Sequence, residues 1–424
     1  MVTLDAERAR KAAAAADEAT ARGEALGPLH GLPITIKDAI ETEGIRSTGG
    51  AVELAGHVPV TDAPAVAQLK AAGAIVFGKT NLPRWSGDMQ AYNQLFGTTN
   101  NPWAPDRVPG GSSGGAAAAV ACGFTSFELG TDIGGSIRLP SHCCGVFGLK
   151  PSFGLVPQRG YLDQVGGGST DADINVFGPI ARAAEDLDLL LGILAGPPPE
   201  QRPAWRVKLL SPGRARLRDY RIGLWLDDPA CPIDTEYLGL LQEAARRLSD
   251  AGAVVETARP DVDFSAQVEL FQHLILAAIS PSLPAEVGEA ASGSHLAWLR
   301  RAQDRARLQA RWAAWFESYD LLLCPVSLTP AFPHDQSDDM MSRTLVINGQ
   351  TRAYLDLANW TGLIGVVGLP SAVVPVGRNA AGVPVGVQVV APYLHDRRAV
   401  RAARLIGQVA GGYQPPPGFG PLSP

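Results

Sequence analysis

The chain has 424 residues, of which 46% are hydrophobic and 18% are charged, so it is long enough to bury a large core. Its formal net charge of −6 gives no basis for nucleic-acid binding, which usually requires a basic surface. The first 27 residues lack the apolar core of a signal peptide, and no apolar run is as long as a membrane span. We therefore expect a cytoplasmic protein without membrane contact.

The N-terminal part predicts alternating helices and strands. An Ala-rich helix is expected over 4–22, and a short buried strand over 32–37 ends at Lys37. A helix over 62–72 and a strand over 74–78 follow, and 85–92 is polar enough for a loop. This alternation predicts an α/β fold in which helices cover both faces of one central, twisted, mixed sheet.

The segment from Pro109 to Arg138 is the strongest candidate for chemistry. Two clusters rich in Gly and Ser, 110–115 and 130–138, flank an apolar segment that is long enough to be a buried helix. Glycine permits positive φ and lets backbone N–H groups converge on one point, so such a loop can form an oxyanion hole. A phosphate-binding loop is less consistent, because no Gly-Lys-Ser/Thr follows the first cluster.

The rest of the chain continues the layered pattern. Segments 154–157 and 175–180 are expected in the same unit, followed by a helix over 183–194 that ends at Gly196-Pro197-Pro198-Pro199. A strand over 221–226, an amphipathic helix over 234–251 and a strand over 253–256 form a βαβ unit. Helical patterns dominate 264–318, a buried strand covers 319–326, and a hairpin joins 372–376 to 383–390.

The five cysteines are an odd number and lie mostly in apolar surroundings, as is typical of reduced core cysteines. Cys143 and Cys144 are adjacent, and no second group of ligands accompanies them. We therefore expect no metal and no cofactor.

Several motifs together resemble the amidase signature family, serine hydrolases that cleave carbon–nitrogen bonds with a Ser-cisSer-Lys triad. They are the two glycine clusters and the segments 31–38, 78–81, 96–103, 144–151 and 368–371. The resemblance implies a single domain over 1–424. Its parts would be an N-terminal helix (1–27), a catalytic core (28–195), a more variable helical cap segment (196–320) and a return to the core sheet (321–424).

The resemblance also implies roles for individual residues. Ser136 would be the nucleophile, Ser112 the bridging acid and base, and Lys37 the general base, with a cis peptide bond between Gly111 and Ser112. Burial beside apolar residues would lower the pKa of Lys37 and leave its amine neutral. The oxyanion hole would consist of the backbone N–H groups of Ile133, Gly134, Gly135 and Ser136.

Other residues are expected to support or line this site. Ser113 would hold Lys37 by a hydrogen bond, Thr131 would support the same loop, and Asp132 and Arg138 are spaced to form a structural ion pair. The substrate-binding residues implied by the resemblance are Ser86, Gly87, Met89 and Ser112. The small size of Ser86 and Gly87 predicts an open, mostly apolar site for small amides, esters or carbamates, on a monomer or homodimer.

Two alternatives remain open. Residues 110–114 also satisfy the G-x-S-x-G elbow of α/β-hydrolases, in which Ser112 would be the nucleophile of a Ser-His-Asp triad. That elbow should follow a strand, whereas 103–109 is polar and broken by proline. The second alternative is the A subunit of an amidotransferase, which shares the motifs and passes ammonia to a partner.

Overall fold

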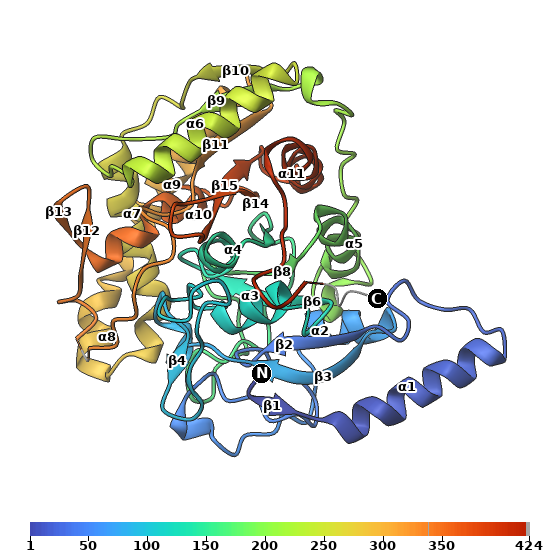
Figure 1. Ribbon diagram of the computed structural model, residues 1–424. Helices are drawn as coiled ribbons and strands as arrows, with labels where there is room; N and C mark the ends of the chain where they lie inside the picture. The colour runs from blue at the N-terminus through green and yellow to red at the C-terminus, as the bar shows by residue number, and fades with distance from the viewer. Residues whose placement is uncertain (338, 421–424) are drawn as a thin grey trace.

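The computed structural model describes residues 1–337 and 339–420, and its centre is a mixed sheet of eleven strands (Figure 1). In spatial order the strands are β1 (Thr3–Leu4), β3 (Ile75–Thr80), β2 (Pro33–Lys37), β6 (Phe127–Asp132), β8 (Val176–Ala181), β7 (Phe147–Lys150), β14 (Ser371–Arg378), β15 (Pro384–Val390), β11 (Leu321–Pro325), β9 (Arg221–Leu224) and β10 (Val254–Thr257). Two small hairpins, β4 (Tyr92–Asn93) with β5 (Gly97–Thr98) and β12 (Thr344–Ile347) with β13 (Gln350–Ala353), stand apart from this sheet.

Strand direction places two of the candidate site residues, Lys37 and Asp132, at one edge of the sheet. β2 is parallel to both β3 and β6, whereas the centre of the sheet from β6 to β11 is antiparallel. Because parallel strands end at the same edge, the last residue of β2, Lys37, and the last residue of β6, Asp132, lie at that edge together. The second glycine cluster starts there.

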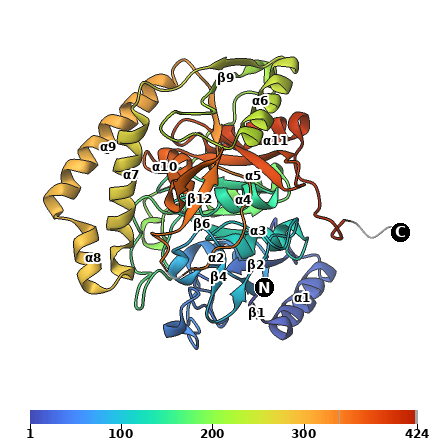
Figure 2. The same cartoon turned by 60° about the vertical axis from the view of Figure 1, so that its left-hand side comes forward.

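Helices cover the sheet on both faces, and the helices of residues 264–315 extend from one side as an arm (Figure 2). The helices are α1 (Ala6–Ala21), α2 (Pro64–Ala71), α3 (Gly114–Ala121), α4 (Arg138–Cys144), α5 (Ala184–Leu194), α6 (Thr235–Asp250), α7 (Phe264–Ile279), α8 (Ala285–Ser292), α9 (His295–Trp315), α10 (Asn359–Gly365) and α11 (Asp396–Ala410). Every residue of α3 and α4 is buried, so the two helices that follow the glycine clusters form part of the core.

Local sequence explains most of these elements. The buried leucines of α5, at positions 187, 190, 191 and 194, repeat at helical spacing. The Asp234 carboxylate accepts a hydrogen bond from the Tyr237 N–H at 2.9 Å and caps the start of α6. None of the helices in the described residues is both long and apolar enough to cross a membrane.

The fold class and most of the predicted elements are confirmed, with shifted ends. The apolar segment between the glycine clusters is helical only up to Ala121, because the chain turns at Gly123 (φ +73°) and re-enters the sheet as β6. Segment 154–157 forms a turn that follows β7. The helices α4, α10 and α11 and the hairpin β12–β13 are elements that the patterns above do not predict.

Candidate active site

Lys37 lies at the end of β2 and is completely buried. Its Nζ donates hydrogen bonds to Ser112 Oγ at 2.6 Å and to Thr131 Oγ1 at 2.8 Å. Burial lowers the pKa of the Lys37 ammonium from its usual 10.5 to about 7, although the carboxylates of Asp132 and Glu128 act in the opposite direction. A substantial fraction of Lys37 is therefore neutral at physiological pH and able to accept a proton.

The pH dependence of stability should report this lowered pKa. Above about pH 7 the unfolded chain holds a proton on Lys37 that the folded chain has lost, so this residue makes the free energy of unfolding rise with pH, by at most about 1.4 kcal/mol per unit. Lys37→Met should reduce that slope between about pH 7.5 and 8.5 by about 1 kcal/mol per unit in urea denaturation. Lys11→Met, at an exposed lysine of α1, is the control. An equal slope in all three proteins would mean that Lys37 stays charged when folded.

Ser112 is buried and follows a cis peptide bond from Gly111. Gly111 has no room for a side chain, because a Cβ there would lie 2.5 Å from the backbone N of Gln90. The missing side chain lets the 88–90 backbone pack directly against the serine loop. The loop predicted to bind substrate and the loop of the first glycine cluster are thereby brought together.

Ser113 does not hold Lys37, contrary to the prediction. Its hydroxyl instead bonds to the backbone of Thr131, accepting from the N–H at 3.4 Å and donating to the C=O at 3.3 Å. Thr131 takes the predicted role, because its side chain projects from the end of β6 toward the Lys37 amine. Ser113 therefore fixes the strand end that carries the partner of Lys37.

Ser136 lies in the turn between β6 and α4 and is 8% exposed. The Ser113 N–H donates to the Ser136 carbonyl at 3.1 Å, which ties the two glycine clusters together. Among the described residues the Ser136 hydroxyl makes no hydrogen bond to Ser112. The structure thus brings Lys37 and Ser112 into direct contact and places Ser136 in the adjoining loop.

The turn from Ile133 to Ser136 offers hydrogen-bond donors. The N–H groups of Ile133, Gly134 and Ser136 have no acceptor among the described residues, and Ile133 and Gly134 are partly exposed. The Gly135 N–H differs from the expectation, because it donates to Asp132 Oδ1 at 2.9 Å. Three of the four predicted N–H groups therefore have no protein acceptor within the part of the chain that the structure describes.

The two glycines of this turn should respond differently to alanine. Gly135 has φ +115°, and a Cβ there would lie 2.6 Å from Thr361 Oγ1, whereas a Cβ on Gly134 would lie 3.2 Å from the flexible end of Ile275. Gly135→Ala should displace the turn and slow covalent labelling by a serine-directed phosphonate at least about 100-fold. Gly134→Ala should slow the same labelling less than about tenfold. Equal losses would contradict this view of the turn.

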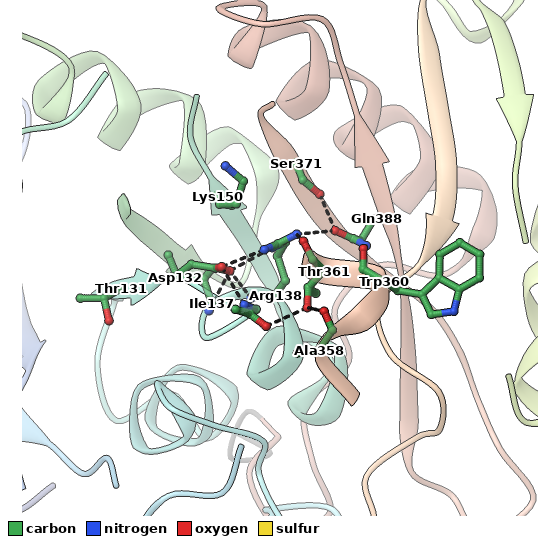
Figure 3. Close-up of polar contacts among 12 residues, drawn as sticks. Thr131, Asp132, Ile137, Arg138, Lys150, Ala358, Trp360, Thr361, Ser371 and Gln388 are labelled. Atoms are coloured by element: carbon green, nitrogen blue, oxygen red, sulfur yellow. Dashed lines mark hydrogen bonds and ion pairs between the residues drawn. The ribbon is translucent and has the colours of Figure 1, made fainter. Parts of the chain in front are cut away.

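A buried ion pair holds the turn in place (Figure 3). Arg138 binds Asp132 with two N–H groups, Nε to Oδ2 at 3.0 Å and an NH2 group to Oδ1 at 2.8 Å, and both side chains are completely buried. Burial alone would raise the pKa of the Asp132 carboxyl, but Arg138 and Lys150 lower it to about 2. The Asp132 carboxylate also accepts from the Ile137 N–H at 3.1 Å. The predicted ion pair is therefore present and keeps Asp132 charged.

Two residues far along the chain complete this network, and the sequence patterns do not reveal them. Arg138 donates to the Thr361 carbonyl at 2.7 Å and to Gln388 Oε1 at 2.9 Å (Figure 3). The Thr361 hydroxyl donates to the Gly134 carbonyl at 2.8 Å. Helix α10 and strand β15 thus support the turn from its far side. Their only sequence signal is the presence of polar residues within otherwise apolar segments.

The loop predicted to bind substrate has an unusual backbone. Trp85 and Ser86 have φ of 52° and 57°, and the buried Ser86 hydroxyl lies beside the hydroxyl of Tyr161. Gly87 is exposed, and Met89 is partly buried. Positive φ at two successive non-glycine residues marks a strained backbone in this loop.

The charged residues beside this loop are paired with each other. Asp88 Oδ2 lies 2.7 Å from Arg343 Nη1, and Arg343 is 4% exposed. Asp88 also accepts from the hydroxyls of Tyr92 at 3.0 Å and Tyr354 at 2.6 Å. This cluster fixes the loop to the segment before β12 and satisfies its own charges.

The elbow alternative does not fit the structure. Residues 99–113, all of which are described, contain no strand, so Ser112 lacks the strand–turn–helix setting of a nucleophile elbow. The partner of its hydroxyl is Lys37 and not a histidine. Ser112 as the nucleophile of a Ser-His-Asp triad is therefore wrong.

Comparison with known proteins gives one consistent result. The family model Amidase matches residues 1–281 and 272–400. The chain is 34% identical to the A subunit of the glutamyl-tRNA(Gln) amidotransferase of Thermus thermophilus, covering 89% of this chain and 84% of that protein, and 32% identical to its counterpart in a Picosynechococcus strain, covering 98% and 92%. Among solved structures, a bacterial aryl acylamidase of the amidase signature family superposes with a TM-score of 0.83 at 26% identity, covering 96% of this chain and 88% of that one.

Proposed function

The chain belongs to the amidase signature family, and from that premise we propose that it cleaves amide carbon–nitrogen bonds through an acyl-enzyme on Ser136. The observation that carries the proposal is the 2.6 Å hydrogen bond from the buried Lys37 amine to Ser112. An amide is a poor electrophile, so cleavage requires an activated nucleophile, stabilisation of the oxyanion and an acid for the leaving nitrogen.

The proposed steps assign one task to each group. Neutral Lys37 takes the proton of Ser112 while Ser112 takes that of Ser136, and Ser136 Oγ attacks the carbonyl carbon. The N–H groups of Ile133, Gly134 and Ser136 stabilise the oxyanion. The proton then returns through Ser112 to the nitrogen as the carbon–nitrogen bond breaks, and water hydrolyses the acyl-enzyme by the same route. The Ser136–Ser112 hydrogen bond that this route requires is expected to form when substrate binds.

We propose an uncharged small-molecule substrate with an aryl or alkyl group on the amide, and esters and carbamates as further substrates. The support is that Asp88 of the predicted substrate loop and Arg343 neutralise each other, while Met89 of the same loop supplies apolar surface. A charged substrate group would have to compete with that ion pair for a partner.

A second candidate is an A subunit of a glutamyl-tRNA amidotransferase, which the identities of 32–34% to such proteins favour. For this candidate we propose the same three residues, together with a different substrate and with partner chains. The chemistry proposed for Ser136 therefore stands under either candidate.

One experiment separates the two. The purified chain is incubated with p-nitroacetanilide, p-nitrophenyl acetate, an aryl carbamate and glutamine, and product release is followed for each. Turnover of the neutral compounds by the chain alone supports a free-standing amidase, either monomeric or homodimeric. Turnover of glutamine alone would favour the amidotransferase candidate and overturn the uncharged-substrate proposal.

A further inference from the structure

Glu128 is a completely buried carboxyl on β6 whose hydrogen-bond donors are hydroxyl groups. Its Oε1 accepts from Thr80 Oγ1 at 2.6 Å, and its Oε2 accepts from Thr35 Oγ1. No lysine or arginine among the described residues forms an ion pair with it. A buried carboxylate without an ion-pair partner is costly to keep ionised, so its protonation state depends on the charges around it.

The register of the sheet places Glu128 beside the proposed base. Thr35 pairs with Glu128 across β2 and β6, and Thr80 pairs with Lys37 across β2 and β3. Thr35 and Lys37 are two positions apart on β2, so their side chains leave the same face. Glu128 therefore binds two threonines that lie on the same face as Lys37 and next to it.

The surrounding charges distinguish Glu128 from Asp132. Lys37 faces the charges of Asp132 and Glu128, both from β6, and the hydroxyls of Ser112 and Thr131. Glu128 faces Lys37 on β2, Lys79 on β3 and, farther away, the amino terminus of the chain. Asp132 is kept ionised by Arg138, and its charge is constant at neutral pH.

Glu128 can change its charge near neutrality. Burial raises the pKa of its carboxyl to about 7, against the opposing effect of its two threonines and of Lys79. Lys37 titrates in the same range, so the two groups are coupled, and each protonation state depends on the other.

We propose that Glu128 is a positioning residue that acts through Lys37: its carboxylate adjusts how much of Lys37 is neutral, and its bonds to Thr35 and Thr80 hold the middle of β2 and the end of β3. The inference rests on the proposed role of Lys37 as base. When Glu128 is ionised, its charge favours the protonated form of Lys37. When Glu128 is neutral, Lys37 loses its proton at lower pH. The charge on this carboxyl thus shifts the acidic limit of activity.

The test measures the rate of Ser136 labelling by a serine-directed phosphonate from about pH 5 to 10, which needs no knowledge of the substrate. Glu128→Gln keeps the size and removes the charge. We expect the acid-side midpoint to move to lower pH by about 0.5–1 unit, while the plateau rate at high pH changes less than about threefold. An unchanged or raised midpoint overturns the inference.

Asp396→Asn is the matched control. Asp396 is also a buried carboxyl with a serine hydroxyl donor, Ser152 Oγ at 2.6 Å, but its charge faces Lys150 and not Lys37. Asp396→Asn should leave the acid-side midpoint of labelling in place. A shift as large as that of Glu128→Gln would overturn the inference. A merely structural role of Glu128 would lower the thermal midpoint without moving the pH midpoint.

Two further variants complete the design. If Glu128→Gln does not fold, Thr80→Val replaces it, because this change removes one donor to the carboxylate at nearly constant volume. The ionised form of Glu128 should then be less stable, so the acid-side midpoint should move in the same direction. An unmoved midpoint overturns the inference. Lys37→Ala separates this inference from the proposed function. If Lys37→Ala labels at the wild-type rate, the proposed base itself fails; if it is inactive and Glu128→Gln has an unchanged midpoint, only the role of Glu128 fails.

Discussion

Replacing Ser136 with alanine is expected to abolish covalent labelling by a serine-directed phosphonate and to reduce amide hydrolysis on the order of 10⁴-fold or more. The reason is that the variant loses the atom that forms the acyl bond, while the hydroxyl of Ser112 remains hydrogen-bonded to Lys37. Labelling is followed by intact-protein mass spectrometry and hydrolysis by product release. Folding should be unaffected, because the Ser136 contact that joins the two loops is made by its backbone carbonyl.

Ser112→Ala provides the comparison for this experiment. This variant keeps the nucleophile and loses the group that relays the proton, so we expect slow labelling on Ser136 and strongly reduced turnover. A phosphonate bound to Ser112 in the wild-type protein would contradict the assignment, because it would make Ser112 the nucleophile.

Replacing Arg138 with methionine should destabilise the fold by about 3–5 kcal/mol, because it leaves the Asp132 carboxylate buried and uncompensated. The same change removes the donors to Thr361 and Gln388, so the turn that carries Ser136 should lose its support. Urea denaturation at neutral pH measures the loss. Phosphonate labelling in the absence of urea should slow in parallel.

Two further variants check the origin of this effect. Arg307→Met breaks an exposed ion pair with Asp304 on α9 and should cost less than about 1 kcal/mol. Asp132→Asn combined with Arg138→Met removes both charges and should recover part of the loss. An Arg138→Met variant as stable as Arg307→Met would show that the buried pair contributes little.

Stability should also depend on pH through Asp132. The pKa of this carboxyl is lowered in the folded protein to about 2, so its contribution is complete above the ordinary value of 3.8 and is lost as pH falls toward 2. Lys37 acts in another range, since its lowered pKa adds stability as pH rises above about 7. Acid and neutral titrations of stability therefore report two different parts of the site.

Much of the site was predictable because it depends on short-range sequence. Glycines at 111 and 135 are required where backbone and side chains approach too closely for a Cβ, and such positions are visible as glycine clusters. The spacing of Asp132 and Arg138 across one tight turn predicts their ion pair. The short apolar run before Lys37 predicts that this residue ends a buried strand, whereas its place in the site was implied by the family resemblance.

The sequence alone therefore determined the α/β class, the two glycine-rich loops and the lysine at a strand end, because each is set by local backbone requirements and apolar spacing. Only the tertiary structure decided that Thr131 and not Ser113 holds Lys37, that Thr361 and Gln388 bind Arg138, and that Glu128 lies beside the proposed base. Those contacts join strands and helices as much as 250 residues apart in sequence. Cross-strand register and core packing fix them, and neither is recorded in the local order of the residues.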